Sequence, residues 1–417
     1  MSANLIRLLG RTGCKESFDL RDFMQRSAVP FEWVELKSDE EARKPPGISS
    51  LTDRRLPVCE LPAGAKLYSP RVRDLAEQLG FLAKPKLKEY DVSIYGAGPA
   101  GLSAAVYAAS DGLKTVLVER AAVGGQAGSS SLIENYLGFP EGISGADLAD
   151  RARQQAVKFG CEILQLREGI VAEFHDRKIH VTLNDGSQLV ARTNICATGV
   201  EYRRLGLPNE NQFLGNGLIY GAGYSESARL TGKTVYVVGG ANSAGQAAMQ
   251  FSRFADRVVM LVRGSNLSAT MSDYLSKRIK HSEKISVRFN TQVTRLSGDD
   301  VLREITVTDK SSGALETLPA TELFVCVGGR PNTEWARDLP ILRDSLGYML
   351  TGSDTYQDGR PPEIWPWKRA PFLLETTVPG SFAAGDVRHG SAKRYATAVG
   401  EGGMAVMFAN HFLEEET

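Results

Sequence analysis

The chain has 417 residues, which at about 150 residues per domain predicts two or three globular domains. Lys and Arg together number 49, as do Asp and Glu, so the net charge is zero, which argues against nucleic acid and anionic membranes as partners. Charged residues make up 24% of the chain and interrupt every apolar run before the roughly 18–20 residues of a membrane span, so we expect no transmembrane helix.

The first residues lack the layout of a signal peptide. Arg7 and Arg11 break the short apolar run of MSANLIRLLGRTG, and no small-residue cleavage site follows it. We therefore expect a cytoplasmic protein. The cysteines are too scattered for a disulfide framework or a metal-ligand spacing, so we expect no bound metal; they are Cys14, Cys59, Cys161, Cys196 and Cys326.

Residues 1–84 are predicted to form a small α/β domain. The predicted elements are a strand over 3–9, a helix after a turn at 10–14, strands over 31–36 and 56–61, and a helix over 71–79. This order resembles the glutaredoxin and thioredoxin-like fold, with Cys14 at the start of the first helix and Pro57 where that family keeps a cis-proline.

A dinucleotide-binding motif follows a linker at 83–88. A strand over 91–95 runs directly into GAGPAG and a helix, and a second strand ends at Glu119. In such a motif the glycines allow a tight turn, close approach of a pyrophosphate and packing of the helix on the strand, while the acid can accept ribose hydroxyls. The alternative is an ordinary glycine-rich turn. The candidate residues are Gly96, Gly98, Pro99, Ala100, Gly101, Glu119 and Arg120.

A second strand, turn and helix begin at residue 234. The strand over 234–238 leads into GGANSA, and the next strand, over 258–262, is followed by Arg263 rather than by an acid. An arginine there accommodates the 2′-phosphate of NADP, so we expect NADPH rather than NADH. Because Ala241 replaces the middle glycine, a retained fold that binds no nucleotide is the alternative. The candidate residues are Gly239, Gly240, Asn242, Ser243, Ala244 and Arg263.

Two such units in one chain suggest FAD together with a nicotinamide that reduces it. Further motifs are GGQ at 124–126, ENYLGFP at 134–140, ATG at 197–199, YRRLGLP at 202–208, PNT at 331–333 and FAAGDV at 382–387. In this order and spacing they resemble bacterial thioredoxin reductase across residues 88–416. The resemblance implies a homodimer with an FAD-binding domain in two segments, 88–205 and 330–417, and an inserted NAD(P)H-binding domain at 206–329.

The same resemblance implies further contacts to FAD. Asp386 would hold the ribityl chain, although it could instead cap a helix, and backbone N–H groups of 393–396 would face the pyrimidine side of the flavin. Gln126 and Asn135 would lie near the isoalloxazine, or be ordinary surface amides. The implied residues are Gly125, Gln126, Asn135, Ala197, Thr198, Gly199, Gly385, Asp386, Arg394, Tyr395 and Ala396.

The sequence departs from that family at the redox-active dithiol. Thioredoxin reductases pass electrons from flavin to a CxxC in the nicotinamide domain, but no cysteine lies between Cys196 and Cys326. The corresponding loop, 217–225, contains Tyr220 and Tyr224, which could cover the flavin or simply pack. A chain without this CxxC resembles the subgroup called thioredoxin reductase-like, whose electron acceptor the resemblance does not settle.

Four functional hypotheses follow for a chain of α/β class with two Rossmann-type domains and a thioredoxin-like N-terminal domain. In the first, electrons pass from NADPH to FAD and directly to a small disulfide, a quinone, a redox protein or oxygen. In the second, Cys14 relays electrons to a disulfide as a monothiol, since Ser17 replaces the second cysteine. The third is a flavin-binding sensor or scaffold with lost NADPH reactivity. The fourth is a dehydrogenase without flavin.

Overall fold

The computed structural model describes residues 5–11, 14–44, 47–82, 84–130, 133, 135–221, 230–299 and 301–415. The chain forms two compact units. The first comprises Met1–Leu75, Ser129–Ser131 and Tyr202–Gly328, and the second comprises Ala76–Gly128, Leu132–Glu201 and Gly329–Thr417. Each unit is therefore assembled from segments that are far apart in the sequence.

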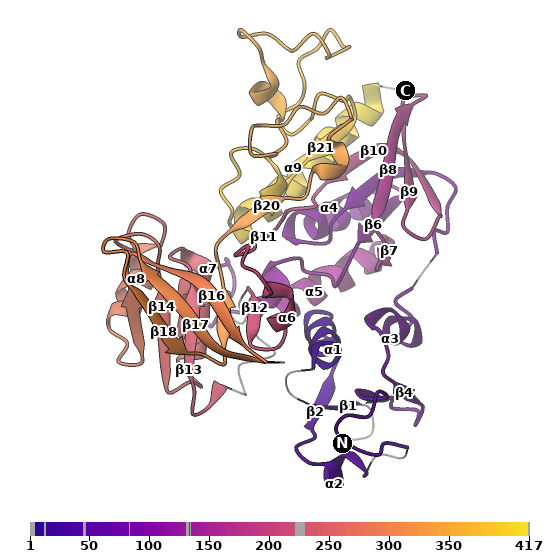
Figure 1. The fold of residues 1–417 in the computed structure, drawn as a ribbon. Coiled ribbons are helices and arrows are strands. Elements are labelled where there is room, and N and C mark those ends of the chain that lie inside the picture. The colour runs from indigo at the N-terminus through magenta and orange to yellow at the C-terminus, as the bar shows by residue number, and fades with distance from the viewer. Residues whose placement is uncertain are drawn as a thin grey trace. The chain divides into compact units, whose positions relative to one another are not determined.

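The N-terminal part of the first unit is built on a four-stranded sheet of order β2-β1-β3-β4. Its strands β1, β2 and β4 are labelled in Figure 1. Strand β1 is parallel to β2 and antiparallel to β3. The Leu56–Pro57 peptide bond is cis, as the position of Pro57 led us to expect. The predicted strands and helices occur in the predicted order, and the structure adds α2 and β4. The elements are β1 (Ile6–Gly10), α1 (Lys15–Arg26), β2 (Phe31–Glu35), α2 (Asp39–Ala42), β3 (Val58–Glu60), β4 (Lys66–Tyr68) and α3 (Val72–Gln78).

The rest of the first unit contains a parallel sheet of order β12-β19-β13-β14-β15 and an antiparallel sheet of order β16-β17-β18. Side chains of β13 and β14 are buried on both faces of the parallel sheet. This explains why the sequences of these two strands are almost continuously apolar. The elements are α6 (Glu210–Phe213), β12 (Leu218–Tyr220), β13 (Thr234–Val238), α7 (Asn242–Phe251), β14 (Arg257–Leu261), α8 (Asp273–Lys280), β15 (Ile285–Arg288), β16 (Thr291–Gly298), β17 (Leu302–Asp309), β18 (Leu315–Pro319) and β19 (Leu323–Val325).

The second unit contains a seven-stranded sheet of order β7-β6-β5-β10-β9-β8, with β21 paired to β10. Strands β7, β6, β5, β10 and β21 are parallel, and β9 and β8 add an antiparallel hairpin. The elements are β5 (Tyr90–Tyr95), α4 (Pro99–Ser110), β6 (Thr115–Glu119), α5 (Gly145–Lys158), β7 (Glu162–Gln165), β8 (Gly169–His175), β9 (Lys178–Leu183), β10 (Gln188–Cys196), β11 (Val200–Tyr202), β20 (Gly329–Pro331), β21 (Ser381–Ala383) and α9 (Tyr395–Glu415).

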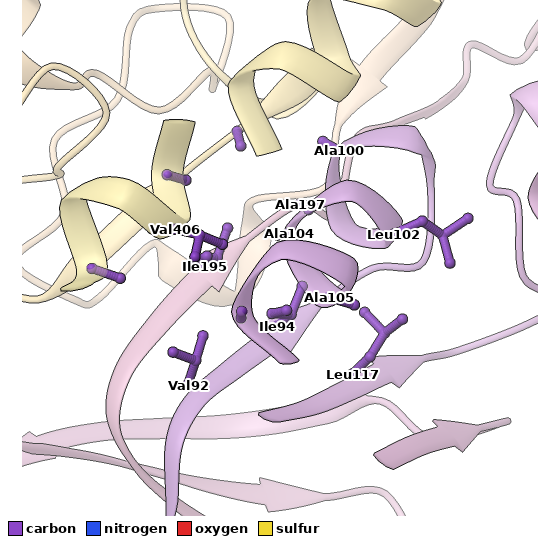
Figure 2. Close-up of a cluster of buried hydrophobic side chains, with 14 of the residues drawn as sticks. Val92, Ile94, Ala100, Leu102, Ala104, Ala105, Leu117, Ile195, Ala197 and Val406 are labelled. Atoms are coloured by element: carbon purple, nitrogen blue, oxygen red, sulfur yellow. The ribbon is translucent and has the colours of Figure 1, made fainter. Parts of the chain in front are cut away.

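Helix α4 packs closely against both the sheet and helix α9 because most of its buried residues are small. Figure 2 shows Ile94 and Leu117 of the sheet beside α4, and Val406 of α9 near Ile195 of β10. The Ser103 hydroxyl donates to the carbonyl of Val399 at the start of this contact, and Asn410 donates to Asp111 at its far end. The two helices thus run in the same direction, and both begin at the carboxyl end of β5.

Within the described ranges no helix is long and apolar enough to span a membrane. The side chains described there also form no group of three or more His, Cys, Asp or Glu that could hold a metal ion.

Candidate nucleotide-binding sites

The turn between β5 and α4 contains three glycines that differ in how closely other atoms approach them. Gly96 has a φ of +102°, and a Cβ there would lie 2.3 Å from the carbonyl oxygen of Ala197. A Cβ on Gly101 would lie 1.8 Å from the carbonyl oxygen of Gly96. At Gly98, in contrast, the described residues offer only the Cα of Gly125 within 4.0 Å. The fold itself therefore requires Gly96 and Gly101, whereas Gly98 leaves space beside the turn.

Helix α4 begins at this space. Its N-cap is Gly98, which has no capping side chain, and Pro99 follows as the first helical residue. Unpaired N–H groups and the helix dipole make such an N-terminus favourable for a phosphate. The open side of Gly98 and the start of α4 together fit a dinucleotide pyrophosphate.

Glu119 is fixed at the end of β6, next to the turn. Its side chain is buried and accepts hydrogen bonds from the backbone N–H groups of Ala97, at 2.7 Å, and of Ala121, at 2.8 Å. A carboxylate can accept about four hydrogen bonds, so acceptor capacity remains for ribose hydroxyls. The next residue, Arg120, is half-exposed and lies within ion-pair distance of Glu168 and Glu201.

The predicted ATG and PNT motifs meet in the second unit. The backbone N–H of Ala197 donates to Tyr95, which places the start of the ATG motif beside the end of β5. Thr198 donates to the carbonyl of Asn332, and the Asn332 amide donates back to the carbonyl of Thr198. The backbone N–H of Asn332 donates to Gly199. These bonds join the two sequence segments of this unit at the edge of the glycine turn.

Asp386 is a largely buried carboxylate with spare acceptor capacity. It lies in a short 3₁₀ turn, Gly385–Val387, whose N-cap is Ala384, so it does not cap that turn. Ser391 donates to Asp386 over a long 3.4 Å. Burial raises the pKa of Asp386, while the nearby Lys393 lowers it. Such a group fits a sugar hydroxyl chain, which the resemblance implies for this residue.

The beginning of α9 carries an aromatic pair. The ring of Tyr395 meets that of Tyr136 edge-on, with centroids 4.8 Å apart. Burial raises the pKa of Tyr395, so its phenol is neutral at pH 7. Arg394 and Ala396, on either side, are exposed.

The two amides predicted near the isoalloxazine differ in their surroundings. The Gln126 side chain donates to the backbone carbonyl of Val200 and is half-buried. Asn135 is exposed. The structure therefore anchors Gln126 within the second unit, whereas Asn135 remains an exposed amide.

The turn between β13 and α7 repeats the geometry of the first. Gly239 has a φ of +140°, and a Cβ there would lie 2.3 Å from the carbonyl oxygen of Cys326. Ala241 is the N-cap of α7 and is exposed, so its methyl group lies at the surface of the turn. Arg263, just beyond β14, is also exposed. This arrangement leaves the start of α7 and Arg263 accessible in the first unit.

A loop closes one side of this second turn. The Asn242 side chain accepts hydrogen bonds from the backbone and hydroxyl of Ser272, at 2.8 and 3.0 Å. Thr270 donates to the carbonyl of Gly240 at 2.8 Å. Asn242 thus holds the loop, while the next residue, Ser243, is exposed and Ala244 is buried.

Tyr220 packs within the first unit. Its hydroxyl donates to Glu210 at 2.6 Å and accepts from the backbone of Leu205 at 2.8 Å, and the Arg204 guanidinium lies over its ring. Burial raises the pKa of Tyr220. These contacts favour the packing interpretation for Tyr220. Tyr224 lies outside the described residues.

All five cysteines are free thiols, and Cys14 alone among them is not buried. It is the N-cap of α1, and its Sγ donates to Glu16 at 3.1 Å, which lowers the pKa of that carboxyl group. Burial raises the pKa of the other four thiols, to about 12 for Cys59, Cys161 and Cys326. Cys161, Cys196 and Cys326 lie among buried apolar side chains.

An ion pair that no sequence pattern predicted supports the backbone of Gly385. Glu401 accepts a hydrogen bond from the backbone of Gly385 and pairs with Arg388. The available signal was a Glu in an otherwise apolar stretch, three residues into the motif VGEG.

Comparisons with known proteins agree with this geometry. The family model for pyridine nucleotide-disulphide oxidoreductases matches residues 90–402. The thioredoxin reductase of Treponema pallidum is 33% identical over 326 residues, covering 78% of this chain and 98% of the relative. That of Bacillus subtilis is 33% identical over 330 residues, covering 79% and 96%. The crystal structure of Lactococcus lactis thioredoxin reductase aligns with a TM-score of 0.69 at 29% identity, covering 78% of this chain and 99% of that one.

Proposed function

Because the chain belongs to the pyridine nucleotide-disulphide oxidoreductase family, we propose that it is an NADPH-dependent FAD oxidoreductase that reduces its acceptor directly, without a dithiol in its nicotinamide domain. FAD would supply the transfer of electrons from NADPH to a second substrate. The main support is that each unit contains a glycine turn of the kind that binds a dinucleotide. In addition, the chain has no cysteine between Cys196 and Cys326.

The chain's own residues would bind and orient the two nucleotides. The start of α4 would receive the FAD pyrophosphate beside Gly98, while Glu119 and Asp386 would accept hydroxyls of the ribose and the ribityl chain. The start of α9 would present its positive end to the flavin, where negative charge develops on reduction. In the other unit, the start of α7 and Arg263 would hold NADPH.

We assign the chain a thioredoxin-like domain at 1–84, an FAD domain at 88–205 and 330–417, and an NADPH domain at 206–329. Support for the first comes from its sheet order, its cis-Pro57 and the place of Cys14 at the start of α1. We further propose that the protein is a cytoplasmic homodimer. Its electron acceptor would be a small disulfide, a quinone or a redox protein. Under it, relative rotation of the two nucleotide domains would bring nicotinamide to flavin.

An anaerobic titration tests the nicotinamide specificity. We expect NADPH to bleach the flavin absorbance near 450 nm and NADH to do so poorly. Arg263→Ala should raise the NADPH concentration required by about ten- to a hundredfold, because a charge-assisted contact to the 2′-phosphate is lost, and should leave the response to NADH unchanged. The matched control is Arg257→Ala, an exposed arginine at the opposite end of the same strand.

Each other outcome of this titration points elsewhere. A yellow protein that neither nucleotide reduces would contradict the reductase and favour the sensor or scaffold. A colourless protein that binds no FAD would favour a dehydrogenase without flavin. Equal reduction by both nucleotides, unaffected by Arg263→Ala, would remove the assigned role of Arg263.

A second candidate function is disulfide reduction through Cys14, which is supported by its position at the start of α1 and by its being the one cysteine of the five that is not buried. A thiolate at the start of a helix is stabilised by the helix dipole and can attack a disulfide as a monothiol. We expect Cys14→Ser to reduce turnover with a small disulfide at least about a hundredfold, while reduction of the flavin by NADPH is unchanged. The control is Cys161→Ala, which removes a buried thiol. Equal disulfide turnover in Cys14→Ser and in the unaltered chain would exclude this route.

A further inference from the structure

The turn that carries Gly385 and Asp386 is held by a buried carboxylate from α9. Glu401 is only 5% exposed, and its Oε2 accepts the backbone N–H of Gly385 at 2.7 Å. Gly385 itself has a φ of +77°, and a Cβ there would lie 2.9 Å from the Cβ of Ala100 in the first turn of α4. The position of this turn is therefore set on one side by Ala100 and on the other by Glu401.

Glu401 is held in turn by an arginine from the far side of the same turn. Arg388 donates from Nη2 to Oε1 of Glu401 at 2.7 Å and from Nε to Oε2 at 3.3 Å. Its Nη1 donates to the carbonyl of His389. A carboxylate paired in this two-point geometry has little freedom to rotate, so the acceptor offered to Gly385 is fixed.

The close approach of α9 to α4 places Glu401 there. A Cβ on the next residue, Gly402, would lie 2.1 Å from the carbonyl oxygen of Ala100. The carboxylate is thereby brought to the end of the sheet where α4 begins. Glu401 binds the Gly385 turn from α9, next to the point where Gly402 meets α4. The three elements that form the proposed FAD site therefore come together beside Glu401.

Glu401 also contributes to the electrostatic environment of Asp386. Its negative charge acts in the same direction as burial, which raises the pKa of Asp386, whereas Lys393 acts in the opposite direction. Lys393 donates to the Tyr348 hydroxyl at 2.7 Å, so its cationic group is also held in place.

We infer that Glu401, paired with Arg388, is a positioning residue that orients the Gly385–Asp386 turn to receive the ribityl chain of FAD. This inference rests on the proposed FAD site and adds a residue to it. Glu401 acts through the backbone of Gly385. A glutamine can still accept that hydrogen bond but loses the charge pairing with Arg388, so the two contributions can be separated.

The test is the affinity of the full-length apoprotein for FAD, measured by quenching of flavin fluorescence. We expect Glu401→Ala to weaken binding about a hundredfold and Glu401→Gln about tenfold. The visible circular dichroism of the flavin in the variants should also change, because its sugar chain is held differently.

The matched control is Glu375→Gln in the same unit. Glu375 is fully buried, accepts backbone N–H groups of Phe372 and Gly380, and pairs with both terminal nitrogens of Arg369. We expect this variant to lower the melting temperature of the apoprotein and to leave the affinity for FAD within about twofold. The inference would be overturned if Glu401→Ala bound FAD as tightly as the unaltered chain, or if Glu401→Ala and Glu375→Gln bound FAD with the same affinity. Failure of the unaltered chain to bind FAD would instead contradict the proposed function.

Discussion

Replacement of Gly98 by alanine is expected to weaken FAD binding strongly in a protein that still folds. A Cβ at this position meets only the Cα of Gly125, at 4.0 Å, among the described residues, so the apoprotein has room for it. The same methyl group would occupy the space at the start of α4 proposed for the pyrophosphate. We expect the affinity for FAD to fall at least about a hundredfold, equivalent to about 2.7 kcal/mol.

The stability of the Gly98→Ala apoprotein provides the control for this result. Its free energy of unfolding, measured in urea, should lie within about 1 kcal/mol of the unaltered apoprotein, the usual cost of alanine at an N-cap. Bound FAD in the purified variant at a full equivalent would show that the pyrophosphate lies elsewhere.

Gly101→Ala should instead damage the fold itself. A Cβ there would lie 1.8 Å from the carbonyl oxygen of Gly96, which belongs to the backbone and cannot move without displacing α4 from β5. Overpacking of this kind costs about 3 kcal/mol or more when the neighbouring atoms are backbone. We expect a correspondingly lower free energy of unfolding of the apoprotein in urea, and loss of FAD.

A helix glycine with free space is the matched control for Gly101. Nothing lies within 4 Å of a Cβ on Gly400 in the described structure, so Gly400→Ala should leave the apoprotein equally stable or stabilise it by about 0.5–1 kcal/mol. Equal unfolding free energies for Gly101→Ala and the unaltered chain would contradict the close contact.

The sequence predicted the nucleotide turns well because their strands are short apolar runs that end at glycines. The strand expected over 234–238 has those bounds in β13, and the strand expected over 91–95 differs from β5 by one residue. Glu119 also lies where the motif predicts, as the last residue of β6, in register with Gln165 of β7.

Contacts that depend on how helices pack were beyond the sequence. The pairing of Glu401 with Arg388 requires α9 to cross α4 at Gly402, and no local pattern of charges encodes that crossing. The role of Tyr220 likewise depends on Glu210, which reaches it from a separate short helix. The sequence shows that Glu401 and Tyr220 can form hydrogen bonds, but only the tertiary structure determines which residues they bond to.

The uneven burial of the five cysteines offers a way to follow the protein in solution. Four thiols have raised pKa values and are shielded, so they are protonated and slow to react with maleimides at pH 7. Cys14, at the start of α1, is only partly buried. A single fluorophore can therefore be attached to the N-terminal domain without removing any cysteine, and its energy transfer to bound flavin would report the distance between the two during turnover.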